Sequence, residues 1–217
     1  MSDIFQEVDE EVRREQLKKL WERYGVYVIA LAVVIVLAVA GWRGYEWWAA
    51  KQAAEAGAAF EAAINLSDEG KHEEAEKAFA KVAEEGRSGY RILGPLRAAA
   101  ELARRDPAAA VKAYDELAAD SSLGPVWQDF AALRAGYLLV DSAPYEEIRR
   151  RLEPAAAGGR AFRNSARELL ALSAWRGGNA AAARNWAEMV LTDAEAPGGA
   201  RNRVAILLAL LGSEGKS

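Results

Sequence analysis

The side chains best suited to acid–base or nucleophilic chemistry are scarce in this sequence. His72 is the only histidine, and it lies in a charged turn, where a solvated residue at a helix start is a simpler interpretation than a metal ligand or a general base. The carboxylate pairs Glu73–Glu74 and Glu146–Glu147 fall in expected first turns of helices, where they complement the helix dipole. The sequence has no cysteine, no G-x-S-x-G, no phosphate-binding loop and no dinucleotide fingerprint. We therefore expect no enzymatic activity, no cofactor and no metal.

Arginine is the remaining residue type that points to binding. The run Arg149–Arg151, together with Arg160 and Arg163, fits either a surface that attracts an acidic partner or a solvated helix face. The formal net charge of the chain is -4, of which the first 24 residues carry -2. Because the rest has no basic excess, nucleic acid is not an expected partner.

The segment from Gly25 to Trp42 contains no charged residue. Its 18 residues would span ~27 Å as a helix, close to the hydrocarbon thickness of a thin bilayer, so it predicts one transmembrane helix. A core helix would keep a polar face, and this segment has none. The small residues Ala38 and Ala40 also fit a cleaved signal sequence, although the acidic leader and the aromatic exit argue against cleavage. Aromatic residues expected at the two membrane interfaces are Trp21, Tyr24, Tyr27, Trp42, Tyr45, Trp47 and Trp48.

The charges beside this segment predict its orientation. Only Arg43 and Lys51 follow it closely, whereas five basic residues precede it: Arg13, Arg14, Lys18, Lys19 and Arg23. By the positive-inside rule the N-terminus stays in the cytoplasm and the remainder crosses the lipid bilayer, a type II topology. Three parts are expected: a cytoplasmic amphipathic helix over 1–24, the anchor with its interfacial aromatics over 25–48, and a helical domain over 49–217. The acidic tip of the first part could bind a cytoplasmic partner or be a solvated helix end.

Four segments beyond the anchor align without gaps and indicate a repeat. They are Gly70–Phe79, Arg105–Tyr114, Ala143–Leu152 and Gly177–Trp186, at separations of 35, 38 and 34 residues. Two residues of each segment and one residue three positions after its end have the helical spacing i, i+4 and i+7, so they share one face. These expected triplets are Ala75, Phe79 and Val82; Ala110, Tyr114 and Leu117; Ile148, Leu152 and Ala155; and Ala182, Trp186 and Met189. The pattern resembles the second helix of a tetratricopeptide hairpin.

The first helices of these hairpins match less well, because their aromatic and glycine slots hold mostly alanine and only Gly136 falls on the glycine slot. Counting back from the triplets places four polar residues on first helices, facing a partner groove where they would bind peptide backbone or carboxylates: Arg97, Arg134, Asn164 and Arg167. The expected first-turn prolines are Pro95, Pro107, Pro125 and Pro144. An apolar run, Val204–Leu211, is expected to cap the stack. The predicted fold class is all-α: a single N-terminal transmembrane helix followed by a tetratricopeptide-like helical-hairpin solenoid.

Beyond the repeats, "GWRGYEWW" at the end of the anchor, the long helix "AAKQAAEAGAAFEAAINL" and the segment "SGYRILGPLRAAAELA" resemble the YfgM-like ancillary subunits of the bacterial Sec translocon. The acidic opening "MSDIFQEVDEEVRREQLKKLWERYG" is similar to the alphaproteobacterial type. The resemblance implies an inner-membrane protein with a periplasmic C-terminal domain. It further implies Sec translocon subunits and a membrane-anchored periplasmic chaperone or prolyl isomerase as partners, and a role in the export or folding of secreted proteins. It brings no catalytic residues.

Two alternatives come from other functional classes. One is a structural adaptor or scaffold subunit that holds another inner-membrane complex together through its anchor. The other is a periplasmic enzyme accessory or hydrolase, which lacks any pairing of a base with a nucleophile in this sequence.

Overall fold

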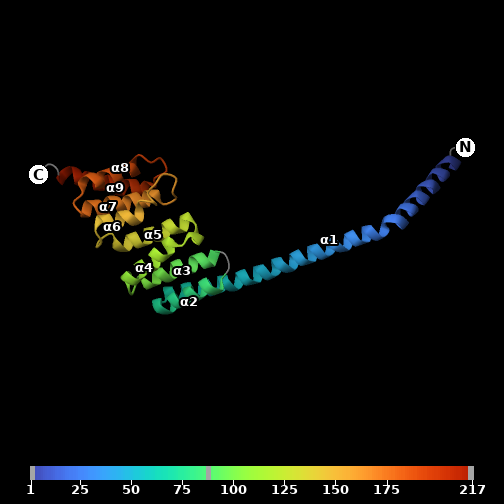
Figure 1. Cartoon of the computed structure of the whole chain (residues 1–217), viewed down its shortest axis with the longest axis horizontal. Helices are drawn as coiled ribbons and strands as arrows, with labels where there is room; N and C mark the ends of the chain where they lie inside the picture. Colours follow the sequence, from blue (N-terminus) through green and yellow to red (C-terminus); the bar gives the residue numbers. More distant parts are fainter. Residues whose placement is uncertain (1–2, 87–88, 215–217) are drawn as a thin grey trace. The chain divides into compact units, whose positions relative to one another are not determined.

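The computed structural model describes residues 3–86 and 89–214; within them, the side chains of residues 3–13, 16, 213 and 214 lie outside the description. Every element of these ranges is helical, which confirms the all-α prediction (Figure 1). The chain divides into two compact units, Met1–Ala54 and Glu55–Ser217. We describe each unit by itself.

The first unit is built from helix α1, Asp3–Asp68, which also supplies the first helix of the second unit. The part of α1 from Leu17 onward contains an 18-residue segment with a mean hydropathy of 2.6, and only 6% of this segment is buried. By length and composition, this part of the helix is a candidate membrane span. The core-helix alternative is therefore wrong, because a core helix would bury its apolar side chains. The seven predicted interface aromatics are all exposed. The side chains that would make the tip of α1 amphipathic lie outside the described residues.

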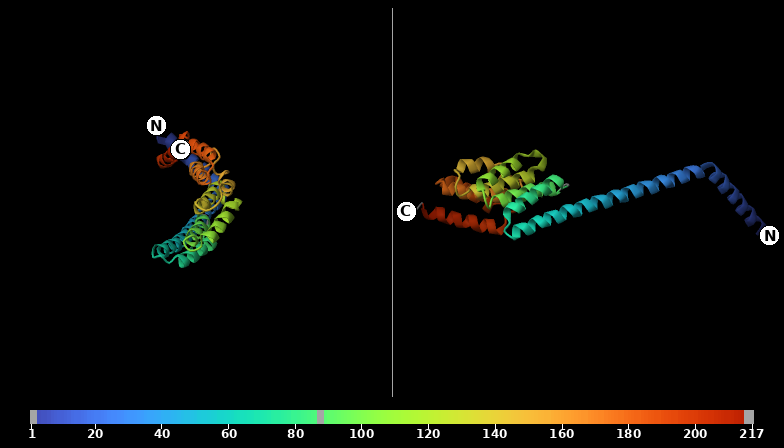
Figure 2. Two further views of the ribbon diagram at one scale, coloured as in Figure 1. Left: turned by 90° about the vertical axis from the view of Figure 1, so that its left-hand side faces the viewer. Right: turned by 90° about the horizontal axis from the view of Figure 1, so that it is seen from below.

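The second unit is a stack of helical hairpins in which each helix from α2 onward packs against the next. Figure 2 shows these helices following one another along an arc. Helices α5 and α7, and likewise α7 and α9, also touch, as expected when first helices of successive hairpins lie side by side. The helices are α2 (His72–Glu85), α3 (Gly89–Leu102), α4 (Pro107–Ala119), α5 (Pro125–Leu139), α6 (Tyr145–Leu152), α7 (Arg163–Arg176), α8 (Ala180–Leu191) and α9 (Gly198–Glu214), with a 3-10 turn, η1 (Ser121–Leu123), before α5.

The four predicted second helices are α2, α4, α6 and α8, and the first three triplets lie on the buried face as predicted, with Leu117 half-buried. The fourth triplet is wrong by one residue. In α8 the buried residues are Ala183, Ala187 and Val190 rather than Ala182, Trp186 and Met189. The reason is the preceding turn, since Gly178 and not Gly177 has the positive φ that Gly70 has before α2. A left-handed turn residue, for which glycine is favoured, thus sets the register.

Two glycines allow close approach between helices. A Cβ atom at Gly136 of α5 would lie 2.9 Å from Leu152 Cδ1 on α6, which confirms the glycine slot. Gly94 of α3 was not anticipated, and a Cβ there would lie 2.8 Å from the carbonyl oxygen of Phe79 on α2. Because real side chains do not tolerate such distances, a side chain at position 94 would push the backbone of α2 away, and one at position 136 would displace the buried side chain of Leu152.

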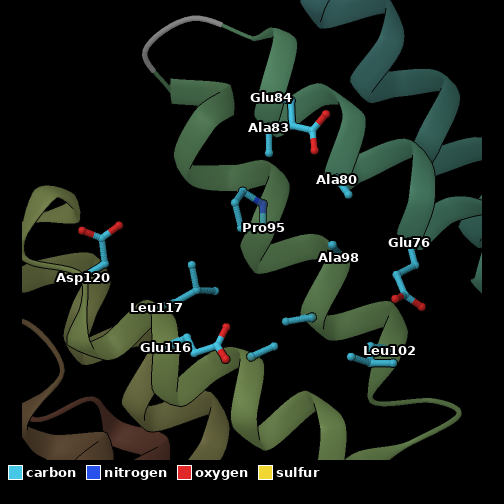
Figure 3. Close-up of a pocket in the computed structure, with 12 residues that line it drawn as sticks. Glu76, Ala80, Ala83, Glu84, Pro95, Ala98, Leu102, Glu116, Leu117 and Asp120 are labelled. Atoms are coloured by element: carbon cyan, nitrogen blue, oxygen red, sulfur yellow. The ribbon is translucent and has the colours of Figure 1, made fainter.

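Proline positions differ from expectation at one place. Pro107 and Pro125 open α4 and α5, and Pro144 is the residue just before α6. Pro95, however, lies inside α3, which already begins at Gly89. Its ring borders a hollow between α2 and α4 (Figure 3). The prediction of a first-turn proline at 95 is therefore wrong, because the helix continues through it.

The apolar run near the C-terminus is part of α9 and caps the stack as predicted. Val204, Leu207 and Leu211 are buried in one cluster with Ala187 and Val190 of α8. Three further clusters of buried residues follow along the second unit. A series of local cores, in place of one central core, is the packing expected of a solenoid.

Candidate partner-binding site

The structure brings Arg97 and Arg134 to one hollow. Arg97 lies on α3 and Arg134 on α5, so both are on first helices as predicted. The hollow has a volume of about 250 Å³ and its walls are mainly apolar and aromatic. It is lined by Leu93, Leu96, Arg97, Ala100, Tyr114, Trp127, Phe130 and Arg134. We call it the arginine pocket.

Aromatic rings support both guanidinium groups of the arginine pocket. The Arg97 guanidinium carbon lies 5.4 Å from the ring centroid of Phe79, and that of Arg134 lies 6.0 Å from the centroid of Tyr114. Such stacking positions an arginine while leaving its N–H groups available. Neither arginine forms an ion pair within the described part of the chain. The pocket therefore offers two cationic donors beside an apolar floor, which suits a carboxylate next to an apolar side chain.

The aromatic floor of the arginine pocket was missed by sequence reasoning. Trp127 and Phe130 stand three residues apart in the first turns of α5, with ring centroids 6.3 Å apart in an edge-to-face arrangement. Helical spacing i, i+3 was available as a signal for a shared face. The tetratricopeptide slots do not include these two positions, so the family pattern alone does not predict them.

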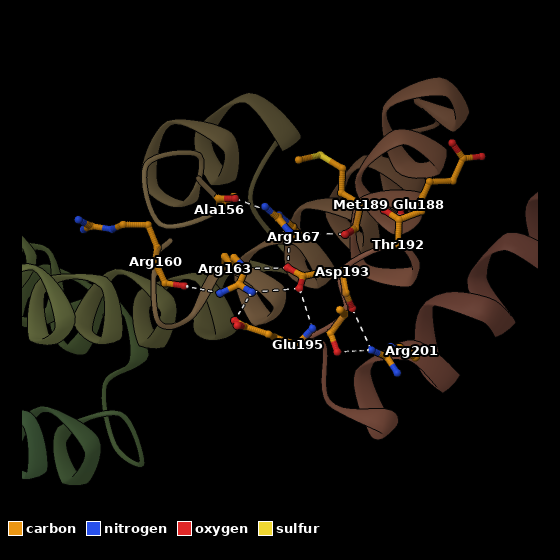
Figure 4. A network of polar contacts seen from close by, with 11 residues as sticks. Ala156, Arg160, Arg163, Arg167, Glu188, Met189, Thr192, Asp193, Glu195 and Arg201 are labelled. Carbon is orange, nitrogen blue, oxygen red and sulfur yellow. Dashed lines mark hydrogen bonds and ion pairs between the residues drawn. The ribbon is translucent and has the colours of Figure 1, made fainter. Parts of the chain in front are cut away.

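The other two predicted groove residues, Asn164 and Arg167, lie in the interior. Both are on α7 and both are only 7% exposed. Arg167 donates hydrogen bonds to the carbonyl oxygens of Ala156 and Met189, and to the carboxylate of Asp193 at 3.0 Å (Figure 4). Asn164 Oδ1 is buried and accepts no hydrogen bond from the described residues. The structure thus gives Arg167 a role inside the stack and does not bring this pair to the arginine pocket.

Asp193 is the centre of the network around Arg167. It accepts hydrogen bonds from Arg163 at 2.6 and 3.0 Å, from Arg167, and from the backbone N–H of Glu195 at 2.9 Å. The Arg163 guanidinium, aided by that backbone N–H, holds the pKa of the Asp193 carboxyl well below its usual range. The same contact raises the pKa of Arg163. The segment between α8 and α9 is thereby fastened to α7.

The pKa of Asp193 makes the stability of the second unit depend on pH. A carboxyl whose pKa is lower in the folded state stabilises the fold above its unfolded pKa of about 4, and this stabilisation is lost as the pH falls below that value. We expect Asp193→Asn to lower the melting temperature at neutral pH, and to lose less on going from about pH 6 to about pH 3 than the wild type. Thermal unfolding followed by circular dichroism at a series of pH values measures this.

Asp141→Asn is the matched control for this titration. Asp141 is exposed and forms no hydrogen bond or ion pair with the described residues. Its variant should keep the acid sensitivity of the wild type. Identical pH profiles for Asp193→Asn and the wild type would show that Asp193 is not linked to folding.

The arginine run is neither an open surface for acidic partners nor a purely solvated face. Arg151 pairs with Asp115 of the preceding hairpin at 2.9 Å, and Arg160 donates to Asp129 on α5 at 2.7 Å. Arg149 pairs with Glu146 of its own helix and with Glu153, the residue that follows this helix. The pairs of Arg151 and Arg160 connect segments far apart in the sequence. Together with the local pairs of Arg149, they neutralise the charges that an acidic partner would need. Within the run only Arg150 forms no ion pair in the part of the chain that the structure describes.

His72 begins α2, as expected, but it is not simply solvated. Its Nδ1 lies 2.8 Å from a carboxylate oxygen of Glu101, which is only 6% exposed. Ser67 Oγ donates to the other oxygen of the same carboxylate at 2.8 Å. Because His72 and Ser67 both contact Glu101, this carboxylate joins α1, α2 and α3. The described residues contain no cluster of three potential metal ligands.

Comparison with protein-family models gives a match over most of the chain. A family model described as a tetratricopeptide repeat-like domain matches residues 18–206. The match begins before the apolar segment of α1, so it includes this segment as well as the hairpins. No curated protein and no solved structure gives a significant match.

Proposed function

We propose, from the premise that this chain belongs to the tetratricopeptide repeat-like family, that it is a membrane-anchored module which assists the export or folding of secreted proteins at the Sec translocon. Stacked helical hairpins of this kind present extended surfaces to protein partners. The function is binding, and no enzymatic activity is part of the proposal.

The observation that carries the proposal is the extent of the family match. It covers the apolar part of α1 together with the repeats, over residues 18–206. A family defined by both parts favours a retained anchor over a cleaved signal sequence, because cleavage would separate them. The exposed apolar side chains of α1 support the same conclusion, since lipid would cover them.

Orientation and partners follow from the charge bias and from the resemblance to the ancillary translocon subunits. Basic residues predominate before the apolar segment, which favours a cytoplasmic N-terminus and a periplasmic C-terminal unit at a bacterial inner membrane. The resemblance adds translocon subunits and a membrane-anchored periplasmic chaperone or prolyl isomerase as the proposed partners. The arginine pocket is the proposed contact, where Arg97 and Arg134 would bind a carboxylate of the partner.

A labelling experiment tests the proposed topology. The chain has no cysteine, so a single introduced cysteine reports its own location. We expect a membrane-impermeant maleimide to label Asn202→Cys, on α9, in intact spheroplasts, and to leave Glu15→Cys unlabelled until the membrane is broken. Both positions are exposed, so access depends on the membrane alone.

Two outcomes would contradict this topology. Labelling of Glu15→Cys but not Asn202→Cys in intact spheroplasts would reverse the orientation. Labelling of both only after lysis would place the second unit in the cytoplasm and remove the export function.

A further inference from the structure

A second hollow lies between α2 and α4, over the middle of α3, and we call it the acidic groove (Figure 3). Its volume is about 470 Å³, within the range of ligand pockets in proteins. Pro95, Leu102 and Leu117 supply apolar surface. The alanines of α2 and α4 that line the groove have short side chains and leave it open. Water therefore contacts apolar side chains here that a partner could cover.

The rim of the acidic groove carries only negative charge. Glu76 and Glu84 stand on the α2 side, and Glu116 and Asp120 on the α4 side, while no lysine or arginine lines the groove. Glu76 accepts a hydrogen bond from Arg105 at 2.7 Å, and Asp120 accepts one from the backbone N–H of Ser122. Glu84 and Glu116 form no ion pair or hydrogen bond within the described residues. Two carboxylates facing each other across apolar surface thus have no cation.

Pro95 lies inside α3 and lines the groove. A proline inside a helix has no N–H and disfavours the helix relative to alanine. Because position 95 has no donor, the carbonyl of Arg91 one turn earlier lacks its usual helical partner. The groove thus combines an apolar floor, which includes the Pro95 ring, with a rim of carboxylates.

The acidic groove is separate from the arginine pocket. At 100° per residue, Pro95, Ala98 and Leu102 lie on one side of α3, whereas the α3 residues of the arginine pocket, Arg97 among them, lie on the opposite side. The two hollows differ in the sign of their charge as well as in position. A partner segment that fits one is repelled by the other.

We propose that the acidic groove binds a basic amphipathic segment of a partner protein, with apolar side chains on the floor and lysine or arginine side chains between Glu84 and Glu116. This inference rests on the proposed interaction function and names the chemistry of a second partner segment. Charge complementarity selects such a segment, since an acidic one would face four carboxylates and a neutral one would leave Glu84 and Glu116 without cations. One chain could then bind two segments of opposite charge on opposite faces of α3.

The test uses the full-length protein in uncharged detergent and a fluorescent helical peptide of leucine and lysine. We expect saturable binding that weakens with added salt, because screening reduces the attraction. Glu84→Gln/Glu116→Gln should weaken binding about tenfold. Glu74→Gln/Glu188→Gln changes the net charge equally at exposed sites outside the groove, and it should keep the wild-type affinity. Circular dichroism of both variants checks that they fold.

Photo-crosslinking tests where the peptide binds on the protein. A benzophenone amino acid replacing Ala80, on the groove wall, should capture the peptide, whereas the same group replacing the exposed Ala181 of α8 should not. Equal affinity of both double variants, or equal capture at both positions, would overturn the proposal. A third outcome would also overturn the proposal: the wild type is a dimer and Glu84→Gln/Glu116→Gln is a monomer. The groove would then bind a second copy of the chain.

The proposal and the proposed function can fail separately. Binding of the peptide in the groove together with a cytoplasmic second unit would keep the groove and reject the export function. The expected topology together with no peptide binding would keep the export function and reject the proposal for the groove. If Arg97→Ala/Arg134→Ala weakened peptide binding as much as Glu84→Gln/Glu116→Gln does, the peptide would not bind in the acidic groove alone. This result would contradict the proposal.

Discussion

Replacing Arg167 by methionine should lower the free energy of unfolding by about 3 kcal/mol and the melting temperature by about 10 °C. Methionine fills a similar apolar volume but donates no hydrogen bond. The carbonyl oxygens of Ala156 and Met189 would lose their donor, and Asp193 would lose one of its two arginines. Buried acceptors left without a donor carry the full cost of their lost hydration, which is why the effect is large.

The effect of Arg167→Met should also be local. In a stack of hairpins each helix contacts mainly its neighbours, so loosening α7 should raise amide hydrogen exchange in α7, α8 and α9 and spare α2, α3 and α4. Arg150→Met is the control, because Arg150 is exposed and forms no ion pair within the described residues, and it should leave melting and exchange unchanged. Equal effects of the two variants would mean that the buried network is not needed for stability.

The second large effect is expected at the arginine pocket. Arg97→Ala/Arg134→Ala should reduce capture of the proposed partner by about tenfold or more, because each charged hydrogen bond to a carboxylate is worth about 1.5–3 kcal/mol. Both side chains stand over aromatic rings and form no ion pair with described residues, so their loss should disturb the fold little. The measurement is the yield of crosslinked partner in membranes, relative to the amount of protein.

Arg150→Ala/Arg184→Ala provides the matched control for the pocket. It also removes two positive charges, from exposed positions on α6 and α8. Its crosslinking yield should equal that of the wild type. A similar loss in both double variants would show a response to net charge alone, and no loss in either would exclude the arginine pocket as the contact.

The second helices were predictable because their signal is local. A turn residue, a helix start and apolar residues at i, i+4 and i+7 fall within one short segment, and they located α2, α4 and α6 with their buried faces. The error in α8 arose because two consecutive glycines precede it, and the pattern does not say which one takes the positive φ. The large residue Trp186 then matched the wrong slot, while the smaller Ala187 is the buried one.

The candidate site was only half predictable because burial depends on residues far away in the sequence. Arg97, Arg134, Asn164 and Arg167 were correctly placed on first helices, but nothing near Arg167 indicates that Asp193 will reach it. The acidic groove was missed for the same reason, since its carboxylates come from two helices separated by a third. Pro95 looked like a helix start because proline is favoured there, and only packing shows a helix that continues through it.

In-membrane crosslinking of the tagged full-length protein, followed by mild-detergent purification and mass spectrometry, identifies the proteins beside this chain and so tests the proposed function. The proposed function predicts enrichment of translocon subunits together with a membrane-anchored periplasmic chaperone or prolyl isomerase. Enrichment of a different inner-membrane complex, with no translocon subunit among the crosslinked proteins, would contradict it and make this chain a scaffold of that complex.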